Sequence, residues 1–393
     1  MGGKAFSTPA GPDQPALDTP RLKPEEYQKI KCECRAVFQE FFEKVETPPE
    51  APGKQDYGDV DFLVERPRKE NFDIIKELTP ILKARRTISN GLTRNFAVPL
   101  EWKPGSYAQI DVHSCREGFL QWQLFNESYG DLWQILGRIH RNVGLTTSDR
   151  GMYLRIAEIE PLDRKASMVF LTKDPRAVME FMGLDPDVYF AGFKDEESLF
   201  QWCASGRFFC RGYVTKTTEN ANDRQRLKKR AMFKRFVDEW VPAHPELGRT
   251  EVLRETVEAE ALKTFSKEAE AQQLIGAVTS KKKEQELWNR IASIVPEEKS
   301  DKLNLAIRAL KRWVRLEDGK PSVREEADMD NDLYPMLSKE LTEDNEKYLF
   351  EWIKENWLEV RTKERKRISA IKDANSAKKK REAEVENHWD ERG

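Results

Sequence analysis

The sequence lacks the features of several common protein classes. Its 393 residues include five cysteines, an odd number with no Cys-x-x-Cys pair, so neither a disulfide framework nor a cysteine zinc site is expected. No segment approaches the roughly 18 consecutive apolar residues of a membrane span, and the first residues lack an apolar signal segment. Lys and Arg (67) nearly balance Asp and Glu (69), which excludes a globally basic nucleic-acid coat. We therefore expect an intracellular protein, cytoplasmic or nuclear.

Charged residues, by contrast, are abundant at 35% of the chain, against a usual share of about 25%. The length predicts two or three structural units. Residues 1–24 are rich in Pro, Gly, Ser and Asp and are predicted to be disordered. Helical and strand patterns alternate over residues 25–175. They include a predicted helix from Pro24, in which Tyr27, Ile30, Cys34 and Phe38 share one side, and a predicted hairpin formed by GMYLRIAEIE and SMVFLT. Helical patterns dominate residues 176–320, and residues 321–393 are predicted to form a charged region that is helical and partly disordered. The fold class predicted is α+β.

The most informative segment is GDVDFLV at residues 58–64. Side chains alternate between the two faces of a strand, so Asp59 and Asp61 project together while Val60 and Phe62 enter the core. Neighbouring carboxylates repel each other, and a fold tolerates them mainly where a divalent cation lies between them. Mg²⁺ takes one or two carboxylates together with water and phosphate oxygens. A D-x-D sequence in a surface strand is nevertheless common, so solvent exposure is the alternative interpretation.

A third carboxylate is available from the segment QIDV, in which Ile110 and Val112 alternate with Gln109 and Asp111. Asp111 faces the same pocket if this strand pairs with the first. Three convergent carboxylates suit in-line phosphoryl transfer, in which one metal activates a hydroxyl and the other stabilises the leaving pyrophosphate. The sequence therefore predicts a site for Mg²⁺ or Mn²⁺ at Asp59, Asp61 and Asp111.

These segments resemble the catalytic palm of the nucleotidyltransferase superfamily, which includes DNA polymerase β and poly(A) polymerases. The stretch from Asp56 to about Trp240 is more closely similar to a group of mainly fungal proteins with that palm. The similarity is carried by YGDVDFLV, YAQIDVHSC, SYGDLWQILG, LTTSDRGMYLRIAEIE, VFLTKDP and MFKRFVDEW. The resemblance implies a palm with a mixed or antiparallel sheet over residues 25–175, followed by a helical domain. It also assigns the paired metal ligands to Asp59 and Asp61 and the third carboxylate to Asp111.

One feature of the superfamily is missing. Its members usually have a Gly-Ser pair about ten residues before the first Asp, where a helix N-terminus holds the triphosphate. No Gly-Ser pair precedes Asp59 in this chain. The nearest substitute is Gly53-Lys54, and we expect Lys54 and Gly58 to lie at the nucleotide. Lys54 would contact a phosphate as a point charge, although an exposed loop lysine is an equally good interpretation.

The sequence also contains a dense basic segment ahead of FVDEW. Phosphate contacts dominate nucleic-acid affinity, so this segment is the predicted place for an RNA or DNA backbone. The alternative is a solvated helix face whose charges balance acidic neighbours. The predicted contact residues are Arg226, Lys228, Lys229, Arg230, Lys234 and Arg235.

The function predicted is a Mg²⁺-dependent nucleotidyltransferase that moves a nucleoside monophosphate from an NTP to a hydroxyl acceptor, RNA being one candidate. Two alternatives stay open. In the first, the palm is catalytically inactive and acts as a binding scaffold for nucleic acid or protein. In the second, the chain is an assembly protein built on the charged helices of residues 250–390. Oligomeric state, nucleobase and acceptor do not follow from the sequence.

Overall fold

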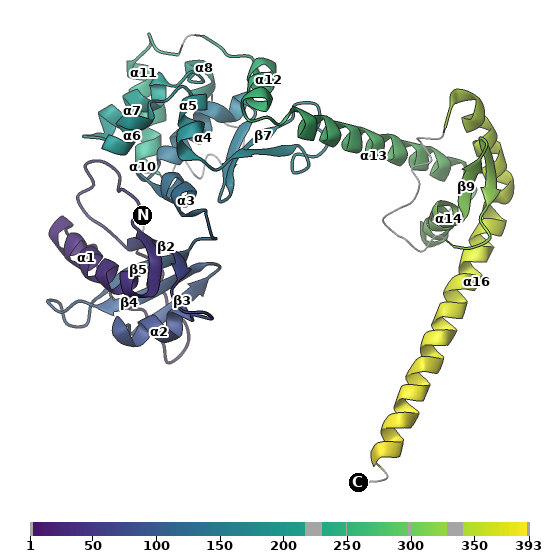
Figure 1. The fold of residues 1–393 in the computed structure, drawn as a ribbon, viewed down its shortest axis with the longest axis horizontal. Helices are drawn as coiled ribbons and strands as arrows, with labels where there is room; N and C mark the ends of the chain where they lie inside the picture. Colours follow the sequence, from purple (N-terminus) through teal and green to yellow (C-terminus); the bar gives the residue numbers. More distant parts are fainter. Residues whose placement is uncertain (1–2, 217–229, 249, 298–299, 328–340, 391–393) are drawn as a thin grey trace. The chain divides into compact units, whose positions relative to one another are not determined.

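The computed structural model describes residues 3–216, 230–248, 250–297, 300–327 and 341–390. The fold is α+β, as predicted, and the chain divides into two compact units, residues 1–271 and 272–393 (Figure 1). The sequence had suggested boundaries after residues 24, 175 and 320. In the ranges described, no helix combines the length and the apolar character needed to cross a bilayer.

A five-stranded sheet forms the first part of unit 1, with the strand order β1-β2-β5-β4-β3. The neighbouring strands β2 and β5 run parallel, and every other neighbouring pair is antiparallel. A parallel pair needs a long connection between its strands, which here contains a helix and two further strands. The strands are β1 Phe42–Glu46, β2 Val60–Pro67, β3 Arg86–Asn90, β4 Thr93–Pro99 and β5 Tyr107–Ser114.

Two helices cover one face of this sheet, namely α1 (Pro24–Phe41) and α2 (Ile74–Ile81). The buried residues of α1 recur at helical spacing, as the sequence predicted, and they pack against alternate residues of the strands. Phe38 meets Phe62 of β2 edge-on, with 4.8 Å between the ring centroids. Because alternate strand residues are committed to this core, the others must face the opposite side of the sheet.

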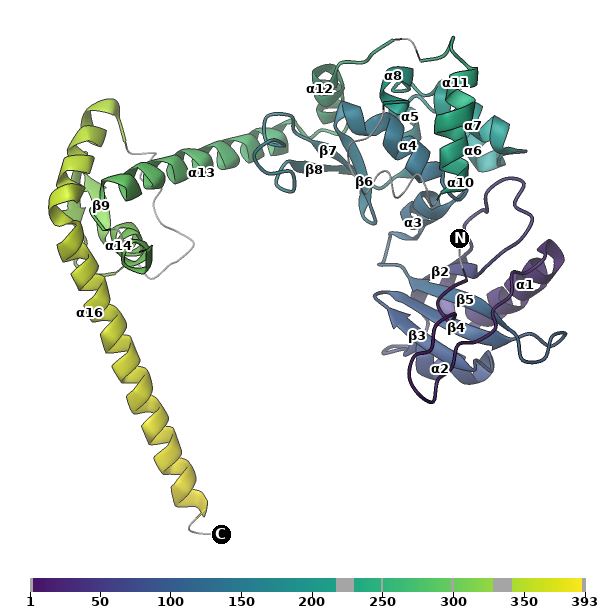
Figure 2. The same cartoon turned by 180° about the vertical axis from the view of Figure 1, so that it is seen from behind.

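The opposite face is partly covered by residues 3–22, and this corrects the prediction of disorder for the N-terminal stretch (Figure 2). Phe6 is completely buried, and the Arg86 guanidinium lies 5.1 Å from its ring. Arg86 also donates hydrogen bonds to the carbonyls of Phe6 and Pro15, at 3.1 and 2.9 Å. One aromatic anchor and one arginine thus order a segment whose average composition is typical of disorder.

The rest of unit 1 is mainly helical, with a three-stranded antiparallel sheet in which β7 and β8 form the predicted hairpin. The strands are β6 Leu145–Ser148, β7 Gly151–Arg155 and β8 Met168–Thr172. The helices up to the first gap are α3 Leu120–Glu127, α4 Leu132–His140, η1 Arg141–Val143, α5 Pro175–Phe181, α6 Pro186–Ala191, α7 Glu196–Ser205 and α8 Arg211–Val214. Those after it are α10 Ala231–Arg235, the π-helix η2 Phe236–Trp240, α11 Val241–Ala243 and α12 Arg254–Thr264.

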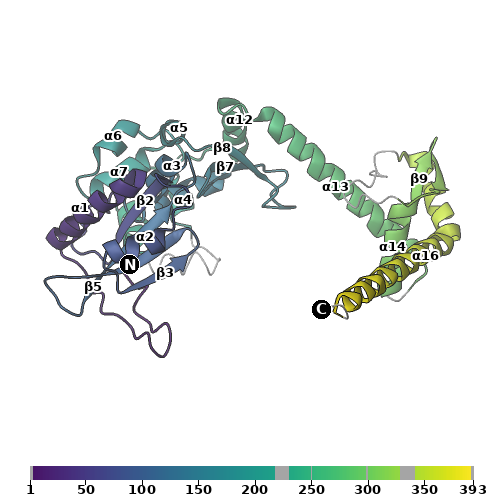
Figure 3. The same cartoon turned by 60° about the horizontal axis from the view of Figure 1, so that its bottom comes forward.

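Unit 2 has a core of its own, formed by α13 (Glu268–Ile294, which begins in unit 1), α14 (Ser300–Trp313) and α16 (Glu343–Asp390). Figure 3 shows α14 beside α16. A hairpin, β9 (Val314–Glu317) and β10 (Lys320–Val323), interrupts the stretch that the sequence predicted as helical. Its turn is Asp318-Gly319, where both φ angles are positive, as a tight hairpin turn requires.

Candidate metal centre

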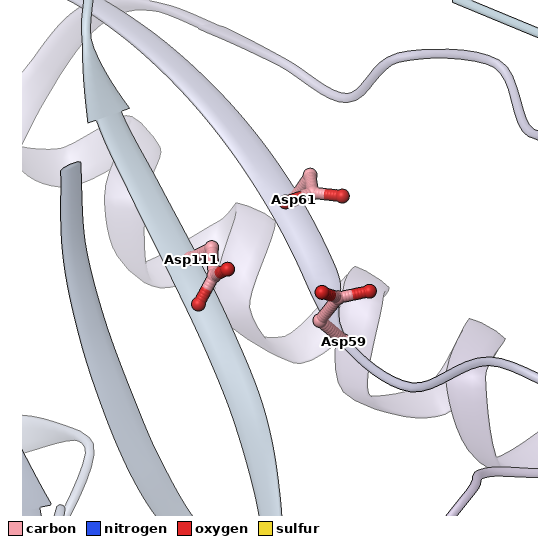
Figure 4. A group of neighbouring side chains, drawn as sticks. All are labelled: Asp59, Asp61 and Asp111. Atoms are coloured by element: carbon pink, nitrogen blue, oxygen red, sulfur yellow. The ribbon is translucent and has the colours of Figure 1, made fainter. Parts of the chain in front are cut away.

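The sheet brings the three predicted carboxylates together at its centre. β2 pairs in parallel with β5, and Asp61 lies directly opposite Asp111 in the register. Val60 and Phe62 point into the core, so Asp61 and Asp111 face the opposite side, with Asp59 just before β2 begins (Figure 4). One oxygen from each carboxylate lies within 4.8 Å of the others, and the residues are partly buried. Strand alternation and one pairing therefore account for the whole cluster.

Two amide side chains hold Asp111 in place. Asn95 on β4, its partner across the antiparallel pair, donates from Nδ2 to Oδ1 at 2.5 Å. Gln109, two residues before it on the same face of β5, donates from Nε2 to both carboxylate oxygens at 3.0 Å. Both amides are buried. The sequence interpretation missed these partners, although the spacing Gln109-x-Asp111 placed one of them on the correct face.

The cluster carries more negative charge than its surroundings balance. Burial raises the pKa of Asp61 well above its usual range, and the charges of Asp59, Asp111, Glu50 and Glu127 raise it further. Burial also raises the pKa of Asp111 to about 6, although the hydrogen bonds from its two amide neighbours act in the opposite direction. A hard divalent cation would relieve this conflict, because carboxylate oxygens are its preferred ligands. The donor set therefore fits Mg²⁺ or Mn²⁺.

Glu50 and Glu127 belong to the negative surroundings of Asp61 but lie outside its strand. Glu127 is the last residue of α3, and Glu50 lies in the loop that leads to β2. Glu50 accepts a hydrogen bond from the hydroxyl of Tyr27 at 3.0 Å. No local pattern marks either glutamate, because each reaches the site through the packing of a different element.

The predicted phosphate contact, Lys54, is engaged within the protein. Its Nζ donates to Glu50 Oε2 at 2.5 Å and lies 4.9 Å from the centre of the Tyr57 ring. Its side chain is about one-quarter exposed. Gly58, also predicted at the nucleotide, is buried next to Asp59. Glu50 would therefore compete with a phosphate for the charge of Lys54, although it uses only one of the three N–H donors of the ammonium group.

The N-terminal segment reaches the same cluster through its backbone. The N–H of Gly3 donates to Asp59 Oδ2 at 2.9 Å, and the N–H of Ala5 donates to Gln109 Oε1 at 2.9 Å. Gly3 has a φ of +80°, and a Cβ at this position would lie 2.0 Å from the carbonyl oxygen of Gly58. Only glycine permits this approach to the site.

The predicted basic segment is described only in part, since Arg226, Lys228 and Lys229 lie outside the described residues. Arg230 is paired with Asp131 at 3.1 Å, and Arg235 forms two hydrogen bonds with Glu196, at 2.8 and 2.5 Å. Lys234 is exposed. Two of the three described cations are thus paired with acidic side chains of other elements of unit 1.

Comparisons with known proteins do not assign this chain to a family. No family model matches the chain, and no curated protein matches its sequence. Among solved structures it is similar to Leishmania infantum polymerase beta in a ternary P/T complex, at 12% identity and a TM-score of 0.33, covering 42% of this chain and 74% of that one. It is also similar to the ternary gap complex of that polymerase, at 11% identity and a TM-score of 0.32. That match covers 42% of this chain and 68% of the other. Similarity at this level carries no argument about activity.

Proposed function

We propose that unit 1 is a metal-dependent nucleotidyltransferase that transfers a nucleoside monophosphate from an NTP to a hydroxyl acceptor. The observation that carries this proposal is the convergence of Asp59, Asp61 and Asp111 on one face of a parallel strand pair, with oxygens within 4.8 Å of one another. In such sites the divalent ions supply the charge that activates the hydroxyl and stabilises the leaving pyrophosphate. Asp59 and Asp61 would hold the ions.

The reaction itself is an in-line displacement. The acceptor oxygen forms a bond to the α-phosphorus, the bond from that phosphorus to the bridging oxygen breaks, and pyrophosphate leaves with the electron pair. Asp111 is the group assigned to help remove the proton of the acceptor hydroxyl. Asn95 and Gln109 keep this carboxylate in one orientation by donating to it. The catalytic assignment thus rests on three acids and two amide side chains that position one of them.

A non-catalytic scaffold is the second candidate function. It is favoured by the engagement of Lys54 with Glu50 and by the absence of a Gly-Ser pair before Asp59. In this case the site would retain an ion for structural reasons, and the unit would bind nucleic acid or protein without transferring nucleotide. The retention of all three carboxylates is the observation against it.

Labelled-nucleotide transfer and Mn²⁺ calorimetry on the full chain test the two candidates. We expect wild type to bind Mn²⁺ and to transfer nucleotide to at least one RNA, DNA or protein acceptor. Asp61→Asn should lose both properties, yet unfold at a higher temperature than wild type without metal, because the repulsion around this carboxylate is gone. The matched control is Asp238→Asn, which removes an exposed carboxylate of η2.

The outcomes separate the candidates. Full transfer activity in Asp61→Asn would overturn the catalytic assignment. Mn²⁺ binding that depends on Asp61, without transfer to any acceptor class, would favour the scaffold. A higher unfolding temperature for the variant shows that its loss of activity does not come from loss of the fold.

A further inference from the structure

A strongly basic stretch lies in the last helix of a chain whose net charge is slightly negative. Residues 361–381 contain ten Lys and Arg but only two Asp and Glu, a formal charge of +8 in a chain with a total of −2. The stretch lies entirely within α16. Like charges three and four residues apart destabilise an isolated helix. The repulsion among these cations therefore lowers the stability of α16, and a polyanionic partner would relieve it.

Several of these cations serve the core of unit 2. Arg361 donates to Glu297 at 2.7 Å, and Lys363 donates to the carbonyl of Arg324 at 2.7 Å. Arg367 pairs with Glu364, a buried carboxylate that also accepts from the indole of Trp313. These cations are used within the fold and are not available to a partner.

A second set lies in a row on the surface of α16. Arg365, Lys372 and Lys379 are seven residues apart, so on an α-helix they lie along one side, with successive Cα atoms about 10 Å apart and the outer two about 21 Å apart. All three are exposed, and within the described part of the chain none of them forms a hydrogen bond or an ion pair. Ser369 and Ser376 lie along the same side. Short polar side chains thus leave the cationic row accessible.

The character of this row distinguishes between classes of partner. In a coiled coil the seven-residue repeat carries apolar side chains, whereas here it carries cations, which disfavours a second helix. A helix that lies on a membrane needs a broad apolar face with aromatic residues. Between residues 361 and 379 the large apolar side chains are only Ile368 and Ile371. Evenly spaced, unpaired cations are instead suited to a chain of phosphates.

We propose that the row formed by Arg365, Lys372 and Lys379 binds the phosphate backbone of a nucleic acid without reading its bases. This surface differs from the basic segment at residues 226–235, whose described arginines are ion-paired. Binding at the row requires neither metal nor NTP, so the inference does not depend on the proposed transfer reaction.

Fluorescence anisotropy of the full 393-residue chain with labelled RNA tests this inference, with EDTA present to exclude the metal centre. The probes are single-stranded RNA, duplex RNA and duplex DNA of roughly 20 nucleotides per strand, titrated between about 50 and 200 mM salt. Arg365→Glu/Lys372→Glu/Lys379→Glu should bind at least about tenfold more weakly. The slope of log K against log salt should also become smaller in magnitude by about 2 to 3. Each lost phosphate contact reduces the magnitude of this slope by about 0.7 to 0.9.

Two control variants accompany it. Arg365→Lys/Lys372→Arg/Lys379→Arg preserves the charge and should bind as wild type does. Lys281→Glu/Lys283→Glu/Lys302→Glu makes the same change of net charge at exposed positions of α13 and α14 and should also retain binding. Circular dichroism checks that α16 remains helical. Wild-type affinity in the charge-reversed variant, or tighter binding to anionic vesicles than to any nucleic acid, would overturn the proposal.

Discussion

Asp61 shows how a single residue can serve a site at the expense of the fold. It is partly buried, and the charges of four other carboxylates raise its pKa. Without a cation this arrangement costs free energy of folding, because ionised groups are held close together away from water. Strand alternation predicted its position, yet the contributions of Glu50 and Glu127 came from elements that the sequence did not connect to it.

His140 predicts a measurable pH dependence of stability. It is the last residue of α4, and burial together with Arg141 and Arg155 lowers its pKa to about 3. In the unfolded chain its pKa is near 6.5, so between pH 6.5 and pH 3 the unfolded state takes up a proton that the folded state does not. Stability therefore falls as the pH falls through this window.

The size of this effect follows from the shift. The contribution of His140 to the free energy of unfolding should be about 2 kcal/mol lower at pH 5 than at pH 7.5. Urea unfolding of wild type and His140→Leu at several pH values isolates it, because groups common to both proteins cancel in the difference. Parallel pH profiles for the two proteins would show that the imidazole is protonated in the fold.

The N-terminal segment is the element whose contact with the site can be tested most directly. A Cβ on Gly3 would lie 2.0 Å from the Gly58 carbonyl oxygen, so Gly3→Ala must displace this end of the segment and break its hydrogen bond to Asp59. Without this hydrogen bond, the Asp59 carboxylate no longer has to give up a donor when it binds an ion. Because one hydrogen bond contributes about 0.5–1.5 kcal/mol, Mn²⁺ should bind about two- to tenfold more tightly.

Calorimetric titration with Mn²⁺ measures this change. Gly11→Ala is the matched control, because nothing lies within 4 Å of the Cβ it would add and its φ is not positive. Equal Mn²⁺ affinity in wild type and Gly3→Ala would mean that the backbone contact does not compete with the ion.

At the scale of the whole molecule, the division into two compact units, each with buried apolar residues of its own, predicts two unfolding transitions. Phe62 lies in the core of the five-stranded sheet, and Leu310 lies in the core of unit 2. Both are fully buried, and truncation to alanine should cost about 2–5 kcal/mol. In scanning calorimetry of the full chain, Phe62→Ala should lower one transition and Leu310→Ala the other. A single transition that both variants lower together would show that the units unfold as one.

Mg²⁺ provides a second test in the same scans. Because the three carboxylates belong to unit 1, saturating Mg²⁺ should raise only the transition that Phe62→Ala lowers. If Mg²⁺ no longer raises this transition in Asp61→Asn, the stabilisation by Mg²⁺ comes from binding at the candidate metal centre.

Much of the local structure followed from sequence patterns. The apolar spacing of α1 and the β7–β8 hairpin appear where periodicity predicted them. The hairpin at Asp318-Gly319 was missed, although its turn residues favour such a turn, because residues 176–320 were interpreted as a helical domain. Average composition likewise predicted disorder for residues 1–24, although Phe6 in this stretch is completely buried. The average composition of a segment does not show that one of its residues anchors it to the core.

Alternation along each strand placed Asp59 beside Asp61 on one face and Asp111 on the polar face of the other strand, because side-chain direction in a strand is a local property. The packed chain decided which strands became neighbours, that Asn95 and Gln109 would hold Asp111, and that Lys54 would pair with Glu50. These contacts connect residues on different elements, and they depend on how the elements pack and on which charged groups pair. No pattern confined to one segment of the chain contains them.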